Sequence, residues 1–339
     1  MKQDKKQPLV AIKCFVYNHE PYLRECLDGF VMQQTEFPFV AIVHDDASTD
    51  HSADIIREYV AKYPDIIQPI YEIENQYSKG DGSLARIMNV AIDATGAKYI
   101  AVCEGDDYWT DSHKLQKQVD YLETHRNVGL CYTDCDIYYE ENKKWERAIY
   151  ALAGESFNAK TVKEPMTVWY KANNTWLYRK AVSDNIKSNK GYIDGALYFL
   201  YNMCLLADVE YIDGVTAVYR RHIGSASCFS ERDDILKKYL YNKNCFLLED
   251  EFIPKFPNSD ENFRNLYNDV LYSLYERACM YNDIEIIRKI DDYFSSLLDM
   301  QMFRKNILIR QQLEKIQQSH AYRLGHALLA PFKLLKSIL

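Results

Sequence analysis

The sequence predicts an α/β fold, in which a mainly parallel sheet is covered by helices on both faces in a Rossmann-like arrangement and is followed by a helical appendage. Strand-like and helix-like segments alternate through the first half of the chain, the pattern that specifies such a sheet. From about residue 231, helical segments follow one another with few strand signals. The length of 339 residues also exceeds what one hydrophobic core usually spans, so a second region is expected.

Five segments are predicted to be strands because they are short, apolar and rich in β-branched residues. They cover residues 9–16, 39–43, 66–73, 99–103 and 128–132. The intervening segments carry apolar residues at helical spacing, as in Leu23, Leu27 and Phe30. In a sheet built this way, ligands bind beyond the carboxyl ends of the strands. Residues that bind ligands are therefore expected directly after the strands.

The sequence predicts three regions: a domain at 1–230, a helical region at 231–318 and a tail at 319–339. Helices are expected at 234–251, 261–280, 283–298 and 303–318. The tail alternates apolar residues with Arg and Lys, which gives a basic amphipathic segment in an acidic protein. Two interpretations stay open for it: a helix packed on the body, or peripheral attachment to an anionic membrane surface.

Bulk composition excludes several classes of protein. The net charge of -8 disfavours binding to nucleic acid, because like charges repel. The nine cysteines are odd in number and lack zinc-ribbon spacing, which favours a reducing, cytoplasmic compartment. The start of the chain does not have the pattern of a signal peptide, and no run of about 18 apolar residues is present. A soluble or membrane-surface protein is expected.

Acidic clusters follow the second and fourth predicted strands. The first holds Asp45, Asp46 and Asp50, and the second holds Glu104, Asp106 and Asp107. Taken alone, the first cluster is typical of a turn with a helix cap. The second has no basic partner nearby in sequence, and crowded carboxylates repel one another unless a cation offsets the charge. Oxygen ligands of this kind suit Mg²⁺ or Mn²⁺, which can in turn hold two phosphate groups.

Three blocks in this order give the chain a resemblance to a known family. They are Val16-Tyr17-Asn18-His19-Glu20, Asp45-Asp46-Ala47-Ser48-Thr49-Asp50 and Glu104-Gly105-Asp106-Asp107-Tyr108-Trp109. Together they resemble the family 2 glycosyltransferases with a GT-A fold, over roughly residues 8 to 230. The chain departs from the common pattern at Val16, where Thr is usual, and at Glu104, where Asp is usual.

The resemblance implies a role for each block. The residues expected at the nucleotide-sugar donor are Val16, Tyr17, Asn18, Glu20, Asp45, Asp46, Arg86, Glu104, Asp106 and Arg220. The residues expected to bind the metal are Asp106, Asp107 and His222, the last from a block similar to the family's Tyr-Arg-x-His. A guanidinium such as that of Arg220 can pair with phosphate oxygens.

A general base must remove the proton of the attacking hydroxyl, and it must lie within about 2.6–3.2 Å of it. The family's base is an Asp at the start of a helix, and Asp194 is the matching residue, although Ile193 replaces the usual Glu. Asp184, Asp208 and Asp213 are alternatives, each of which is also typical of a cap or a turn. With such a base the reaction forms no covalent intermediate, and the sugar's configuration inverts.

The implied activity is the transfer of one sugar, as a hexosyltransferase, from a nucleotide diphosphate sugar, with UDP the expected carrier, to a glycan or lipid-linked glycan acceptor. The setting would be synthesis of a bacterial surface polysaccharide, such as capsule or O-antigen, at the inner face of the membrane. Two other classes stay open: a sugar-phosphate nucleotidyltransferase, and an inactive GT-A scaffold. A dehydrogenase is set aside, because no glycine-rich turn follows the first strand.

Overall fold

The computed structural model describes residues 7–149, 172–187, 191, 195–225, 235–252, 255, 274–275 and 277–295. The chain divides into two compact units, Met1–Phe263 and Arg264–Leu339. The predicted boundaries at 230 and 318 stay predictions. The helices predicted at 303–318 and in the tail, and most of the helix predicted at 261–280, lie outside the described residues.

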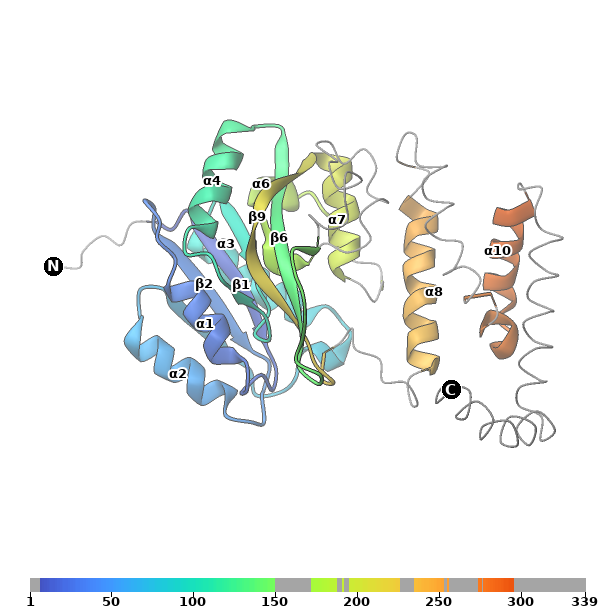
Figure 1. Cartoon of the computed structure of the whole chain (residues 1–339), viewed down its shortest axis with the longest axis horizontal. Helices are drawn as coiled ribbons and strands as arrows, with labels where there is room; N and C mark the ends of the chain where they lie inside the picture. Colours follow the sequence, from blue (N-terminus) through green and yellow to red (C-terminus); the bar gives the residue numbers. More distant parts are fainter. Residues whose placement is uncertain are drawn as a thin grey trace, which may run out of the picture. The chain divides into compact units, whose positions relative to one another are not determined.

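The first unit is built on one sheet with the strand order β3-β2-β1-β4-β8-β6-β9-β5, and with β7 paired to β6 (Figure 1). The strands are β1 (Val10–Val16), β2 (Phe39–Asp45), β3 (Ile67–Tyr71), β4 (Tyr99–Val102), β5 (Tyr108–Trp109), β6 (Val128–Tyr139), β7 (Lys144–Glu146), β8 (Trp176–Arg179) and β9 (Asp208–Arg221). The pairs among β3, β2, β1 and β4 are parallel, and so is β6 with β9. β8 runs antiparallel between β4 and β6, and β5 runs antiparallel to β9.

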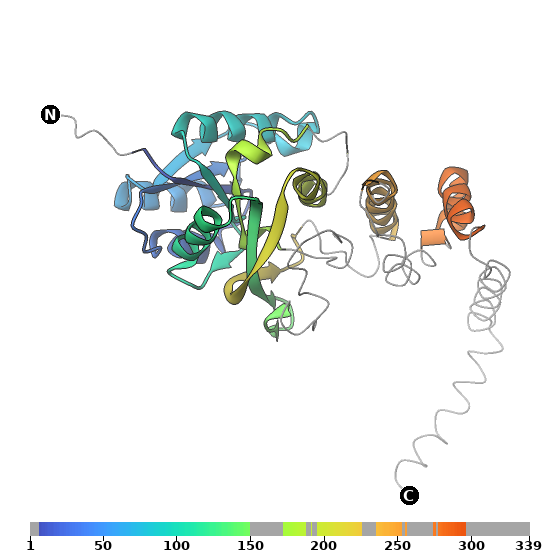
Figure 2. The ribbon, with the colours of Figure 1, turned by 90° about the horizontal axis from the view of Figure 1, so that it is seen from above.

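Most helices of this unit connect or cover the strands of the sheet, and the last helix, at Ile235–Phe252, contacts Tyr198 and Tyr201 of the helix before it through Phe252. They are α1 (Leu23–Val31), α2 (Ser52–Lys62), α3 (Ser83–Thr95), α4 (Lys114–Thr124), α6 (Lys180–Ser183), α7 (Gly195–Leu206) and α8 (Ile235–Phe252), with short 3-10 turns η1 (Tyr77–Lys79) and η4 (Asn173–Thr175). Seen from above, α3 and α4 lie on opposite faces of the sheet (Figure 2). The strand order explains the place of α3: the crossovers through α1 and α2 advance from β1 toward β3, the crossover through α3 returns past β1 to β4, and right-handed crossovers then place α3 on the face opposite α1 and α2.

The central strands are buried along most of their length, as parallel strands covered on both faces must be. The core therefore lies between the sheet and its helices, and polar side chains gather where the strands end. The second unit contributes α10 (Ile284–Ser295), which falls within the helix predicted at 283–298. No helix among the described residues is both long enough and apolar enough to cross a membrane.

Candidate active site

The loops that follow β1 and β2 are tied to each other by reciprocal hydrogen bonds. Asn18 has a left-handed backbone, with φ of 56°, and its side-chain oxygen accepts the Thr49 N–H at 2.7 Å. The Glu20 N–H donates to an Asp50 carboxylate oxygen at 3.0 Å, and the Glu20 carboxylate accepts the His51 N–H at 3.1 Å. Asn18 and Glu20 therefore shape one rigid double loop at the carboxyl edge of the sheet.

Val16 and Tyr17 sit at the base of this double loop. The Val16 side chain is buried, and its carbonyl accepts the Asp46 N–H at 2.9 Å. The Tyr17 ring is 45% exposed, so it is open to a ligand. Beside Val16, Asp45 ends β2 with a buried Oδ1 that has no hydrogen-bond partner, and burial raises the pKa of this carboxyl above its ordinary value.

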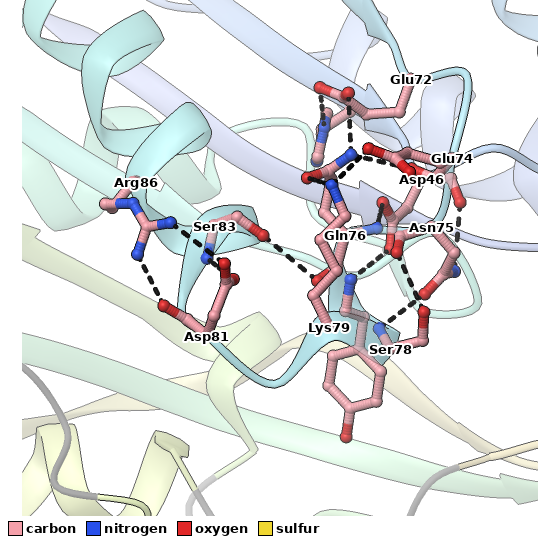
Figure 3. Close-up of polar contacts among 12 residues, drawn as sticks. Asp46, Glu72, Glu74, Asn75, Gln76, Ser78, Lys79, Asp81, Ser83 and Arg86 are labelled. Atoms are coloured by element: carbon pink, nitrogen blue, oxygen red, sulfur yellow. Dashed lines mark hydrogen bonds and ion pairs between the residues drawn. The ribbon is translucent and has the colours of Figure 1, made fainter.

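Asp46 anchors the segment that follows β3 (Figure 3). Its Oδ1 accepts the Gln76 N–H at 2.6 Å and its Oδ2 accepts the Tyr77 N–H at 3.0 Å. The side chain of Asn75 donates to the Asp46 carbonyl at 3.2 Å. Each carboxylate oxygen of Asp46 thus already holds one main-chain amide, so this residue builds the wall of the candidate site.

Arg86 lies in the first turn of α3, at the end of the same segment (Figure 3). Its guanidinium donates to the Asp81 carbonyl at 2.6 Å and pairs with the Asp81 carboxylate at 3.5 Å. The side chain is 64% exposed, which leaves its charge accessible.

The acidic turn between β4 and β5 approaches the loop after β1 through a glycine. The Gly105 N–H donates to the Phe15 carbonyl at 2.9 Å. A Cβ at this position would lie 2.7 Å from Nδ1 of His19 and 3.0 Å from Val16, distances that only glycine avoids. Gly105 therefore allows the turn to pack closely against the loop after β1.

Asp106 and His222 form a pair across the site, although 116 residues separate them in sequence. The Oδ2 of Asp106 lies 3.2 Å from Nε2 of His222, and both side chains are largely buried. Burial opposes ionisation of Asp106, but the bond to His222 and the nearby His19 outweigh it and hold the pKa of Asp106 below its ordinary value. The Gly224 N–H donates to Nδ1 of His222 at 3.2 Å, so Nε2 carries the proton and donates to Asp106.

The side chain of Asp107 points at β9, whereas that of Asp106 points at His222. The Oδ1 of Asp107 accepts the main-chain N–H of Arg220 at 2.8 Å, and the side chain is 1% exposed. Burial, together with the neighbouring charge of Asp106, raises the pKa of Asp107 well above its usual range. The metal-ligand role predicted for Asp107 stays a prediction.

Glu104 opens the acidic turn, and its side chain is partly buried. Burial and the charge of Asp106 raise the pKa of Glu104 to about 7, against the opposing influence of Lys13. The side-chain amide of Asn173, in η4, is 3.5 Å from its Oε1. The longer arm of Glu104, compared with the usual Asp, thus reaches the segment before β8.

The predicted base, Asp194, lies outside the described residues, directly before α7. Of the alternatives, Asp184 ends α6 and pairs with Lys180 at 2.9 Å. Asp208 accepts a bond from Asn127 at the start of β9, and Asp213 accepts one from Tyr211 at 3.4 Å. These contacts fit the cap and turn roles that the sequence also allowed for them.

Three residues near the site were not among the predicted site residues. The His19 ring lies 6.5 Å from the His222 ring, and the Tyr22 ring lies 4.6 Å from it. Asn173 reaches Glu104. His19 belongs to the block Val16-Tyr17-Asn18-His19-Glu20, which signals its place, whereas Tyr22 and Asn173 carry no signal in the sequence, because their partners are remote.

The side chains of the candidate site differ in how well they suit a divalent cation. Across the described ranges, no group of three or more His, Cys, Asp or Glu side chains is arranged to hold a metal ion. The pair formed by Asp106 and His222 nevertheless offers a carboxylate oxygen and an imidazole nitrogen directed at each other, a donor set that suits Mn²⁺ and that nucleotide phosphates can complete. Ligation through Nε2 would place the proton on Nδ1 and so replace the bond from Gly224.

Several known proteins are similar in sequence to part of this chain. An uncharacterised protein of Mycobacterium tuberculosis is 37% identical over 224 residues, which cover 63% of this chain and 59% of that protein. A putative teichuronic acid biosynthesis glycosyltransferase of Bacillus subtilis, TuaG, is 27% identical over 145 residues, 43% of this chain and 54% of that protein. The chain thus spans about three fifths of the length of the first relatives that it matches.

Among solved structures, the mannosyltransferase PcManGT of Pyrobaculum calidifontis, in complex with GDP-Man and Mn²⁺, superposes with a TM-score of 0.55. The identity is 14%, over 97% of this chain and 89% of that one, and this likeness confirms the predicted GT-A fold. A family model described as glycosyl transferase family 2 matches residues 14–187, about half of the chain. The chain therefore belongs to glycosyl transferase family 2.

Proposed function

We propose that this chain is an inverting hexosyltransferase that moves one sugar from a nucleotide diphosphate sugar, a UDP-sugar, to a hydroxyl of an acceptor glycan. The observation that carries the proposal is the pairing of Asp106 with His222 at 3.2 Å, at the strand edge where the loops after β1, β2 and β4 meet. Ligands of parallel sheets bind at this edge. Membership of family 2 supports the same chemistry.

Asp106 and His222 would hold the divalent cation, Mn²⁺ or Mg²⁺, with Asp107 beside them. When bound, such a cation neutralises negative charge that develops on the departing diphosphate. The chain's own residues would position the donor. Tyr17 offers an exposed ring at the nucleobase side, and Arg86 an accessible charge.

The donor pocket of this proposal is shaped by residues already engaged in the fold. Asn18 and Glu20 fix the double loop, and Asp46 fixes the segment at Gln76 and Tyr77. Rigid walls reduce the ordering that donor binding would otherwise require. Their contribution to donor affinity would then come through the shape of the pocket.

Asp194 would act as the base that takes the proton of the acceptor hydroxyl. Its place directly before α7 matches the position expected from the family. A positioned base contributes about 10²–10⁴-fold to rate, so its loss leaves donor binding intact while turnover falls.

The test is a screen of nucleotide sugars with Mn²⁺, which measures donor binding by calorimetry and turnover as free nucleoside diphosphate, run on the wild type, Asp106→Asn and Asp194→Asn. Asp106→Asn is expected to lose metal-dependent donor binding. Asp194→Asn is expected to keep binding and lose at least 100-fold in turnover. Asp184→Asn is the matched control, because Asp184 pairs with Lys180 at the surface, and it should behave like wild type.

Release of pyrophosphate instead of nucleoside diphosphate would assign the chain to the nucleotidyltransferases. Absence of binding to any donor would favour the inactive scaffold. Full turnover by Asp106→Asn would contradict the role given to the Asp106–His222 pair.

The acceptor in this proposal is a lipid-linked glycan of a bacterial surface polysaccharide, such as capsule or O-antigen, at the cytoplasmic face of the membrane. The relation to TuaG, whose name assigns it to teichuronic acid synthesis, supports this setting. The basic amphipathic segment 319–339 would provide the membrane contact. Deleting it should reduce association with anionic liposomes and leave donor hydrolysis in place; equal association of the truncated chain would refute the membrane role.

A further inference from the structure

The guanidinium of Arg220 is enclosed between the acidic turn and two other elements of the fold. Its Nε donates to the main-chain carbonyl of Asp106 at 2.9 Å. Its Nη1 donates to Glu140, just beyond β6, and its Nη2 donates to Glu25 on α1. The side chain is 4% exposed. Each nitrogen of the guanidinium therefore already has a protein acceptor.

Aromatic rings surround the same group. The guanidinium carbon lies 4.9 Å from the ring centre of Tyr22, 5.1 Å from that of Tyr108 and 5.7 Å from that of Tyr138. These distances are within the range of cation–π attraction. Tyr22 also contacts the ring of His222 at 4.6 Å. The rings exclude water from the guanidinium and fix its plane.

Arg220 holds Asp106 and Asp107 of the acidic turn by different atoms. The side-chain Nε fixes the carbonyl of Asp106, and with it the direction in which this residue leaves the turn. The main-chain N–H fixes the carboxylate of Asp107 at 2.8 Å. A change in the direction of Asp106 would alter its 3.2 Å approach to His222.

We propose that Arg220 is a positioning residue, which sets the geometry of Asp106 toward the cation, and that it makes no contact with the diphosphate of the donor. This inference rests on the proposed function, because it assumes that Asp106 and His222 bind the cation. It replaces the phosphate contact predicted from the sequence. Residues that orient metal ligands in this way commonly influence metal affinity by about 10- to 100-fold.

The test uses the full-length chain and Mn²⁺ alone, with free Mn²⁺ followed by electron paramagnetic resonance. Arg220→Lys keeps the charge but loses the planar fork that reaches three acceptors. We expect about tenfold weaker Mn²⁺ binding in this variant. Arg221→Lys makes the same change one residue later, where the guanidinium lies over Tyr139, and should bind Mn²⁺ as the wild type does.

A second measurement is UDP affinity in EDTA. If Arg220 only positions the metal ligands, UDP affinity without metal stays within about twofold of wild type in Arg220→Lys, a result that also shows that the variant is folded. Glu140→Gln, which removes one anchor of Arg220, should weaken Mn²⁺ binding in the same direction. Unchanged Mn²⁺ affinity in Arg220→Lys, with UDP affinity lost, would establish direct phosphate contact and overturn the inference.

Asp106→Asn separates this inference from the proposed function. If the wild type binds Mn²⁺ and Asp106→Asn does not, the metal site holds, and equal Mn²⁺ affinity in Arg220→Lys would refute only the positioning role. If Asp106→Asn binds Mn²⁺ like the wild type, the proposed site fails, and the positioning role fails with it.

Discussion

The buried Lys114 should affect the free energy of unfolding by an amount that follows from its surroundings. The side chain begins α4 and is fully buried. Its Nζ donates to Gln118 at 2.6 Å, lies 3.4 Å from the Thr175 carbonyl and sits 4.5 Å from the ring centre of Trp109. Burial without a carboxylate bonded to it lowers the pKa of Lys114 from 10.5 to about 8. A charged lysine at this position therefore costs stability.

One pKa unit corresponds to about 1.36 kcal/mol, so the lowering at Lys114 corresponds to roughly 3 kcal/mol. Between the folded and unfolded pKa values, the unfolded chain binds more protons at this lysine than the folded chain. The free energy of unfolding therefore rises with pH in that window, by about 2 kcal/mol between pH 8 and pH 10. Below pH 8 the full cost is present.

Replacing Lys114 with Met removes the charge and keeps most of the volume. The variant loses the bond to Gln118, worth about 1 kcal/mol, so we expect a net gain of about 2 kcal/mol at pH 7. The gain should disappear toward pH 10. Urea unfolding followed by tryptophan fluorescence at several pH values measures both effects.

Lys117→Met is the matched control, because Lys117 lies on the same helix with a side chain 57% exposed. It should show the same pH dependence as wild type. A Lys114→Met variant whose stability changes with pH as steeply as that of the wild type would refute the account of Lys114 as a buried charge.

Three further substitutions test the loops of the site. Gly105→Ala would place its Cβ 2.7 Å from Nδ1 of His19, which should cost about 1–3 kcal/mol of stability, and Gly105→Ala with His19→Ala should recover part of it in thermal unfolding. Asp46→Asn leaves only one side-chain oxygen for two amide donors and should lower the free energy of unfolding by about 1–3 kcal/mol. Limited proteolysis near residues 72–82 should then be faster, and resistance to proteolysis equal to that of the wild type would contradict the anchoring role. Asn18→Ala loses the bond to Thr49 and puts Ala at positive φ, so it should lower the free energy of unfolding by about 2 kcal/mol. Asn18→Gly loses only the bond and should lower it by about half as much. Equal losses of stability in the two variants would exclude backbone strain.

Much of the sheet could be predicted because its central strands carry a local signal. The predicted strands at 9–16, 39–43 and 99–103 correspond to β1, β2 and β4 to within two residues at each end. Short apolar runs followed by acidic residues also indicated where β2 and β4 end. These features depend on neighbours in sequence, which is what periodicity measures.

The shorter elements escaped prediction. β5 and β8 have two and four residues, too few to show a period, and β8 enters the sheet antiparallel between β4 and β6. The position of β8 in the sheet is set by its pairing with β4 and β6, which come from remote parts of the chain. The predicted sheet was therefore correct for its parallel half and incomplete for the edge that carries β9.

The amino-acid sequence by itself determined the family, the order of the central strands and helices, and the acidic residues at the strand ends, because each depends on local pattern or on motif order. Only the tertiary structure decided which side chains meet. It pairs Asp106 with His222, gives the oxygens of Asp46 to backbone amides and surrounds Arg220 with carboxylates and rings. These contacts join residues many positions apart, and a side chain's partner is set by the packing of the whole sheet.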